Sequence, residues 1–180
     1  MMDHAYGYGL VSRFFHWAMA LLVLYQVFTA TLHYFLDDTA ITDFFFSWHF
    51  SNGVLLLCLA VLRGAWGLIN LSRRPAHDQG IHRLAAVGHV VMYGLLIVIP
   101  TIALVRAYGS EHAFSPFGID LFAARDAKIE WMTNFGNEWH GFFGWILFAL
   151  IAGHIVMAFV HSYVWKQPMI ARMTRGHEQP

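Results

Sequence analysis

Cysteine and charge are both scarce in this sequence of 180 residues. There is one cysteine, Cys58, so the chain can form neither an internal disulfide nor a cluster of thiolate ligands. Charged residues make up 12 % of the chain, whereas a soluble domain has about a quarter. A soluble helical bundle with long core helices is the competing interpretation, and this low charge argues against it.

Four stretches contain no charged residue at all, and each is 19 to 27 residues long. A membrane-spanning helix needs about 20 apolar residues. We therefore predict an all-α integral membrane four-helix bundle that forms a single domain over residues 1–180. Its spans are expected at about 14–36, 44–64, 84–106 and 139–165. The longest connection, residues 108–137, is too short for a separate domain and is expected to contain one short interfacial helix at residues 128–135.

Basic residues are divided unevenly between the two ends of such a bundle. Eight of the eleven Lys and Arg residues fall on the end that carries both termini, and Arg106, Arg125 and Lys128 fall on the other. Eight of the eleven acidic residues also lie on that second end, which has a formal balance of −5. Because cytoplasmic loops of membrane proteins are rich in Lys and Arg, both termini are expected in the cytoplasm.

Four histidines occur in the predicted spans at two depths. His16 lies near the inner end of the first span, and His49 lies near the outer end of the second. His140 and His154 are fourteen residues apart on the fourth span, so they share one helix face and are separated by about 21 Å. An ionisable residue within a span is costly and marks a candidate functional site, although a single one can be a neutral ring bonded to a neighbouring helix.

Depth in the membrane pairs these rings, His16 with His154 at the inner level and His49 with His140 at the outer level. Two imidazoles that face each other inside a helix bundle are typical of a bis-histidine iron site. The sequence has no Cys-x-x-Cys-His motif, so a haem would be held by axial ligation and packing rather than by covalent bonds. We predict two non-covalent haem b groups, one for each pair.

A porphyrin also needs flat space, and its propionates need cations. Gly53 and Gly144 each follow a predicted ligand by four residues, about one helix turn, although glycine is common in membrane helices because it permits close packing. Arg13 and Arg63 are expected at the level of the inner pair, and Arg106 at the outer end of the third span. The alternative for each arginine is the ordinary placement of a charged head at the membrane surface.

Several short runs resemble the bacterial cytochrome b-561 family. The runs are residues 14–17 (FFHW), 48–53 (WHFSNG), 88–93 (GHVVMY) and 139–140 (WH), together with His154. The resemblance extends from about residue 8 to residue 173, and the histidine spacing on the fourth span is similar to that in the di-haem subunits of formate dehydrogenases and nickel hydrogenases. It implies a four-helix di-haem b cytochrome that exchanges electrons with quinone, with ligands corresponding to His16, His49, His140 and His154.

His89 and His161 remain near the inner surface. We predict them as the catalytic residues, because they could hydrogen-bond ubiquinone or relay its protons beside the inner haem. The alternative for either residue is a packed, hydrogen-bonded histidine at the membrane boundary.

The expected function is electron transfer between the quinone pool, at the inner haem, and an unknown partner on the outer face of a bacterial inner membrane. Some members of the family resemble superoxide oxidases that reduce ubiquinone. Superoxide is an anion and would need a positively charged approach to the outer haem, so the acidic outer end argues against this function. A haem-free carrier of metal ions or protons would use the same histidines. Membrane lipid surrounds the chain, and no contact with nucleic acid is predicted.

Overall fold

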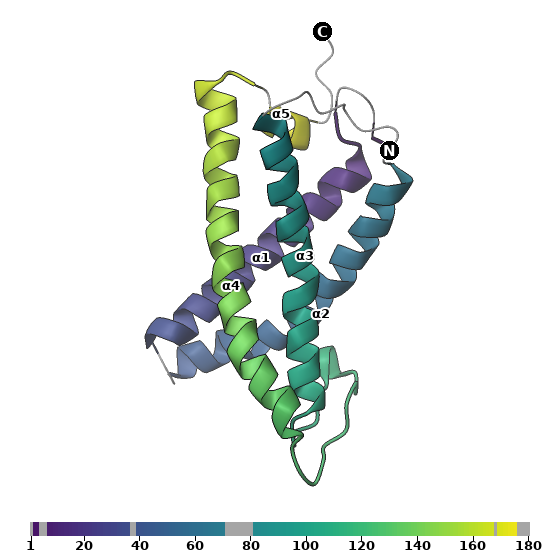
Figure 1. The fold of residues 1–180 in the computed structure, drawn as a ribbon, viewed down its shortest axis with the longest axis vertical. Helices are drawn as coiled ribbons and strands as arrows, with labels where there is room; N and C mark the ends of the chain where they lie inside the picture. The colour runs from purple at the N-terminus through teal and green to yellow at the C-terminus, as the bar shows by residue number, and fades with distance from the viewer. Residues whose placement is uncertain (1, 4–6, 37–38, 71–80, 168, 176–180) are drawn as a thin grey trace.

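Four long helices form the molecule. The computed structural model describes residues 2–3, 7–36, 39–70, 81–167 and 169–175, with only the backbone for residues 81–84. The long helices are α1 (Leu10–Leu36), α2 (Ala40–Ile69), α3 (Ile81–Tyr108) and α4 (Glu130–Phe159), and they run alternately up and down (Figure 1). All four are long and apolar enough to cross a membrane. The prediction of an all-α chain with four such helices is confirmed.

The shorter elements lie at the two ends of the bundle. The 3-10 turn η2 (Pro116–Gly118) belongs to the connection between α3 and α4. After α4, the chain makes one π-helical turn, η3 (Val160–Val164), and then a short helix, α5 (Met169–Thr174). We call the end with α5 and the start of α1 the terminal end, and the end with residues 109–129 the loop end.

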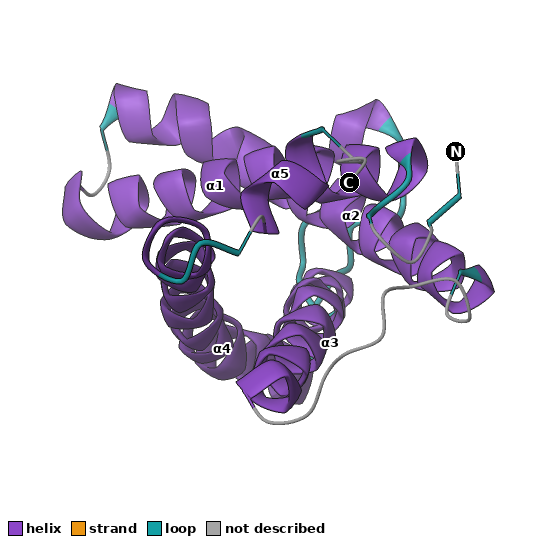
Figure 2. Cartoon of the chain, turned by 90° about the horizontal axis from the view of Figure 1, so that it is seen from above, coloured by secondary structure: helices purple, strands orange, loops and turns teal. Residues whose placement is uncertain are grey.

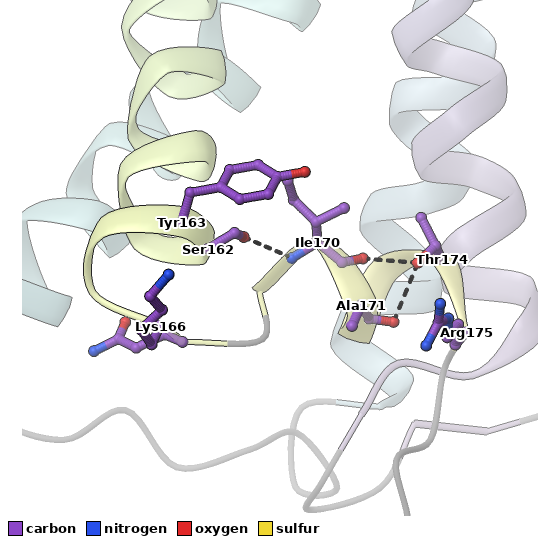
Figure 3. A pocket seen from close by; sticks show the side chains of 8 residues that line it. Ser162, Tyr163, Lys166, Ile170, Ala171, Thr174 and Arg175 are labelled. Atoms are coloured by element: carbon purple, nitrogen blue, oxygen red, sulfur yellow. Dashed lines mark hydrogen bonds between the residues drawn. The ribbon is translucent and has the colours of Figure 1, made fainter.

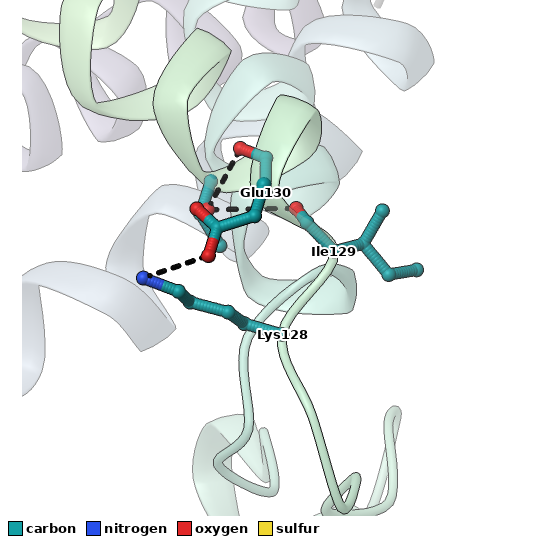
Figure 4. Close-up of polar contacts among 4 residues, drawn as sticks. Lys128, Ile129 and Glu130 are labelled. Atoms are coloured by element: carbon teal, nitrogen blue, oxygen red, sulfur yellow. Dashed lines mark hydrogen bonds and ion pairs between the residues drawn. The ribbon is translucent and has the colours of Figure 1, made fainter.

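The fourth long helix begins earlier than its charge-free stretch predicts. Residues 128–135 do not form a separate interfacial helix, because α4 runs without interruption from Glu130. A carboxylate is favourable in the first turn, where unpaired N–H groups carry partial positive charge. Lys128 and Glu130 form an ion pair of 3.2 Å there, and the Thr133 hydroxyl donates to the carbonyls of Ile129 and Glu130 (Figure 4). The other long helices likewise extend beyond their charge-free stretches, because charged residues are tolerated at helix ends.

The buried core is small, and much of the outer surface is apolar. Met19, Val23, Leu56 and Ala60 form a buried cluster between α1 and α2. In contrast, Leu21 is 67 % exposed and Val90 is 72 % exposed. Many other large apolar side chains along the four helices are also exposed, as expected for helices whose solvent is lipid rather than water.

The helices pack as two antiparallel pairs, α1 with α2 and α3 with α4, and α2 joins the pairs through α3 (Figure 2). Where α2 meets α3, the Tyr93 hydroxyl donates to the Ala60 carbonyl. A Cβ at Gly64 would lie 2.9 Å from that hydroxyl oxygen, so glycine permits this approach. The arrangement leaves histidines from α1 and α2 facing histidines from α4.

The terminal end is tied together by its short helix. The Arg13 guanidinium donates to the Thr174 carbonyl at 2.6 Å, and the Trp17 indole donates to the Met173 carbonyl at 2.9 Å. α5 therefore bridges the end of α4 and the start of α1. Which side of the membrane this end faces stays a prediction, and Arg73 and Arg74, on which it partly rests, lie outside the described residues.

Candidate functional site

At the loop end, the structure brings His49 of α2 together with His140 of α4. Their ring centroids are 6.1 Å apart, and the ring planes are inclined by 75°. Each ring also has a hydrogen-bond partner at Nδ1. The Thr29 hydroxyl lies 2.9 Å from the His49 nitrogen, and the Ile99 carbonyl lies 3.1 Å from that of His140. Both contacts leave Nε2 as the ring nitrogen available to a ligand.

At the terminal end, His16 of α1 lies beside His154 of α4. Their centroids are 6.5 Å apart, with the planes inclined by 68°. His89 of α3 is nearer still to His154, at 5.0 Å and 84°, and donates from Nδ1 to its own helix at the Ala85 carbonyl. Arg63 lies at this level, close enough for its charge to act on both His16 and His154. Three imidazoles and a cation therefore gather at this end.

The predicted arginines all have defined neighbours. Arg63 approaches the Met19 sulfur at 4.0 Å, and Arg13 is bonded to α5. Arg106 lies near His140 but donates to the Asn137 amide oxygen at 2.5 Å. Its side chain lies directly against Gly136, where an added Cβ would collide with the arginine Cβ. Arg63 therefore lies at the level of the terminal-end histidine pair, and Arg106 lies at the level of the loop-end pair.

The two predicted glycines have different surroundings. A Cβ at Gly53 would lie 3.4 Å from the Gln26 amide nitrogen, so this glycine faces α1. A Cβ at Gly144 would meet no atom within 4 Å among the described residues. The side of the helix at Gly144 is therefore open, whereas the side at Gly53 is occupied by Gln26.

His161 lies in the π-helical turn after α4 and is 8 % exposed. Its Nδ1 lies 2.6 Å from the Gln167 amide oxygen, so the ring donates to that oxygen, and the Trp165 ring lies edge-on at 4.5 Å. Gln167 also lines an open pocket of about 380 Å³ between η3 and α5. Figure 3 shows Tyr163, Lys166 and Arg175 around this pocket.

The family described as prokaryotic cytochrome b561 matches residues 7–176. The chain belongs to this family. It is also 27 % identical over 175 residues to cytochrome b561 homolog 2 of Escherichia coli (strain K12), covering 92 % of this chain and 90 % of that protein. A second relative, named probable superoxide oxidase CybB, from Yersinia pestis, is 29 % identical over 130 residues, covering 69 % of this chain and 72 % of that protein.

Membership in the cytochrome b561 family implies haem b, and the paired rings fit such a group. A metal midway between two imidazoles holds the ring centroids roughly 6 Å apart, because each metal–nitrogen bond is about 2 Å long and each nitrogen lies about 1 Å from its ring centre. The separations of 6.1 and 6.5 Å match this value, whereas the 5.0 Å between His89 and His154 is too short for two ligands on opposite sides of one metal. In the described part of the chain, no three His, Cys, Asp or Glu side chains form a metal site by themselves.

Sequence reasoning missed the partners of the histidines in this cytochrome. Thr29 and Gln26 lie one helix turn apart on α1, and Gln26 donates to the His49 carbonyl at 3.0 Å. Two polar side chains three residues apart in an apolar span were a usable signal, because a buried polar group needs a partner. Gln167 had no comparable signal, since the turn that returns it to His161 is not evident from the pattern of apolar residues.

Proposed function

We propose that this membrane cytochrome binds two haem b groups, one between His49 and His140 and one between His16 and His154. The observation that carries the proposal is the spacing of the two ring pairs, whose centroids are 6.1 and 6.5 Å apart, close to the separation expected for two imidazoles bound to one metal ion. Family membership supports the same cofactor and disfavours a haem-free carrier of metal ions or protons.

Bound haem b would supply reversible one-electron chemistry. His49 and His140 would hold one haem, and His16 and His154 the other, so that α4 contributes one imidazole to each site. The four helices are long and apolar enough to cross a membrane, so both pairs would lie within its hydrocarbon core and away from bulk water. Such surroundings raise the energy of added charge and give the protein control over the reduction potential.

We further propose that quinone reacts at the terminal end. Oxidation of a quinol releases two electrons and two protons, so the site needs groups that bind the headgroup oxygens and accept protons. Gln167 lines a pocket of about 380 Å³, within the size range of small-molecule sites, and its amide oxygen accepts a hydrogen bond from the His161 imidazole. His89 adds an imidazole next to His154. Arg13, which was expected at the same level, already donates a hydrogen bond to a carbonyl of α5.

The proposed orientation puts the terminal end in the cytoplasm of a bacterial inner membrane. Of the cations on this end, Lys166 and Arg175 border the pocket. The acidic loop end then faces outward and would meet the second redox partner. Charge of this sign favours a basic partner protein, mainly through the rate of encounter.

Haem stoichiometry is the direct test of the cofactor proposal. Pyridine haemochrome analysis of the purified full chain should give two haems per chain with the spectrum of non-covalent haem b. A yield of one haem, or of none, would rule the proposal out. A colourless protein would restore the haem-free carrier as an explanation of the intramembrane histidines.

Superoxide oxidation is the second candidate, favoured by the name of the Yersinia pestis relative. In that reaction, superoxide loses one electron at the loop end and leaves as oxygen. The three loop-end cations have local contacts: Arg106 with Asn137, Arg125 with the Tyr108 ring and carbonyl, and Lys128 with Glu130. A fast reduction of the cytochrome by superoxide that slows as salt is added would favour this function over electron transfer from a protein.

A further inference from the structure

Thr29 is a fully buried polar residue in the middle of a membrane-spanning helix, with 0 % of its surface exposed. Its hydroxyl oxygen has two close neighbours, the Gln26 carbonyl oxygen at 3.0 Å and the His49 Nδ1 at 2.9 Å. The first neighbour is on the same helix, and the second is on α2. The hydroxyl therefore connects the backbone of one helix to the functional side chain of another.

The direction of these bonds follows from the number of protons. A carbonyl can only accept, so the single hydroxyl proton of Thr29 goes to Gln26. The hydroxyl oxygen must then accept from His49, which places the ring proton on Nδ1. The lone pair is left on Nε2, the nitrogen that a metal between His49 and His140 would use. On the opposite ring, the Ile99 carbonyl accepts from His140 and so places the proton of that ring on Nδ1 as well.

We propose that Thr29 is a positioning residue of the loop-end haem site. Its hydroxyl fixes the tautomer and rotation of His49, and it increases the electron donation of that ring to iron. This inference rests on the proposed ligation of haem by His49 and His140. A hydrogen bond at the outer ring nitrogen makes an imidazole a more basic ligand and favours the ferric state. Because the partner is a neutral hydroxyl, the interaction adds no charge to the apolar interior.

Thr29 can be tested separately from its neighbours. The bond to His140 comes from the main chain, so no side-chain substitution removes it. Thr29→Val keeps the shape of the side chain but cannot accept a hydrogen bond, while Thr29→Ser keeps the hydroxyl. Thr101→Val is the matched control, because the Thr101 hydroxyl donates only to its own helix at the Ile97 carbonyl and is exposed.

The measurements are haem content, a redox titration and the electron paramagnetic resonance spectrum of the ferric protein. Thr29→Val should retain the terminal-end haem unchanged and shift the loop-end haem to a higher potential. A tenfold loss in preference for ferric over ferrous iron corresponds to about 59 mV. The loop-end ferric signal should change as well. Thr29→Ser and Thr101→Val should resemble the parent.

Partial loss of the loop-end haem in Thr29→Val, with Thr29→Ser fully loaded, would also support the proposal, because a side chain that hydrogen-bonds to a metal ligand contributes to metal affinity. If Thr29→Val does not assemble, Thr29→Ala replaces it in the comparison with Thr29→Ser. Two results would overturn the role of Thr29. One is a loop-end haem whose content, potential and ferric signal are unchanged in the variant without the hydroxyl. The other is a Thr29→Ser variant whose loop-end potential shifts as far as that of the variant without the hydroxyl. If His49→Ala keeps both haems, the proposed ligation itself is wrong.

Discussion

The two histidine pairs lie at opposite ends of α4, and their surroundings differ. At the loop end, both rings are anchored through Nδ1, His49 by Thr29 and His140 by the Ile99 carbonyl. At the terminal end, neither His16 nor His154 has a ring hydrogen bond within the described part of the chain, but His89 and Arg63 lie beside them. The comparison indicates one pair whose rings are held by hydrogen bonds to neighbouring helices and one pair whose rings lie beside a further imidazole and a guanidinium.

Loss of a whole haem is the largest effect that can break this comparison. We expect His49→Ala and His140→Ala to remove one and the same haem, and His16→Ala and His154→Ala to remove the other, because each variant deletes one of two axial ligands. Low-temperature absorption spectra of the four variants distinguish the two haems. If His16→Ala and His140→Ala affected the same haem, the pairing by depth would be wrong.

The second largest expected effect is on the rate of reduction by quinol, which should depend on the terminal end and not on the loop end. His161→Ala should slow quinol-driven reduction by roughly a hundredfold, since a positioned acid or base contributes about that much or more, while both haems are retained. Arg106→Ala, at the loop end, is the control and should react as the parent does. Rapid mixing with a soluble quinol provides the rates. A slow Arg106→Ala together with a normal His161→Ala would move the quinone site to the loop end.

His89 offers a sharper test of the terminal-end pair. His89→Leu should retain both haems and shift only the terminal-end potential, because its ring is too near His154 to share a metal across a porphyrin. His112→Leu, in the exposed connection, serves as the control for removing a histidine. A redox titration with haem analysis checks both variants. Haem loss in His89→Leu equal to that in His16→Ala would identify His89 as the ligand.

The smallest effect concerns the connection of α5 to α1. Trp17→Phe removes the indole bond to the Met173 carbonyl but keeps an aromatic ring. We expect the free energy of unfolding to fall by about 0.5 to 1 kcal/mol, which lowers the melting temperature in detergent by about 1–4 °C. Trp131→Phe, at an exposed position of the loop end, should change less. Equal melting temperatures for the two variants would show that the bond contributes nothing measurable.

Residue spacing alone predicted the number of long helices and which histidines would lie near one another, because helical rise determines depth. That these rings bind iron stays a prediction. The start of α4 at Glu130 was missed, since a charge-free stretch reports the hydrocarbon core and a helix can extend beyond it. Thr29 and Gln167 were missed for another reason. Contacts between helices depend on the rotation of each helix about its axis, and one sequence without its packing partners does not define that rotation.

The differing environments of Gly53 and Gly144 illustrate the same limit. Both follow a histidine by four residues, so spacing treats them as equivalent. In the folded chain, one faces the Gln26 amide and the other faces open space. A helix presents the residue four positions later on nearly the same side, but what lies opposite that side is decided by the neighbouring helix.

One continuous helix, α4, contributes a ring to each pair, and this has a mechanical consequence. An α-helix resists stretching, since lengthening it breaks backbone hydrogen bonds. Tilting or sliding of α4 would therefore carry His140 and His154 together as one body. α4 therefore keeps the distance between the two proposed redox centres constant. A partner that docks at either end can change the driving force for electron transfer but not the distance over which the electron is transferred.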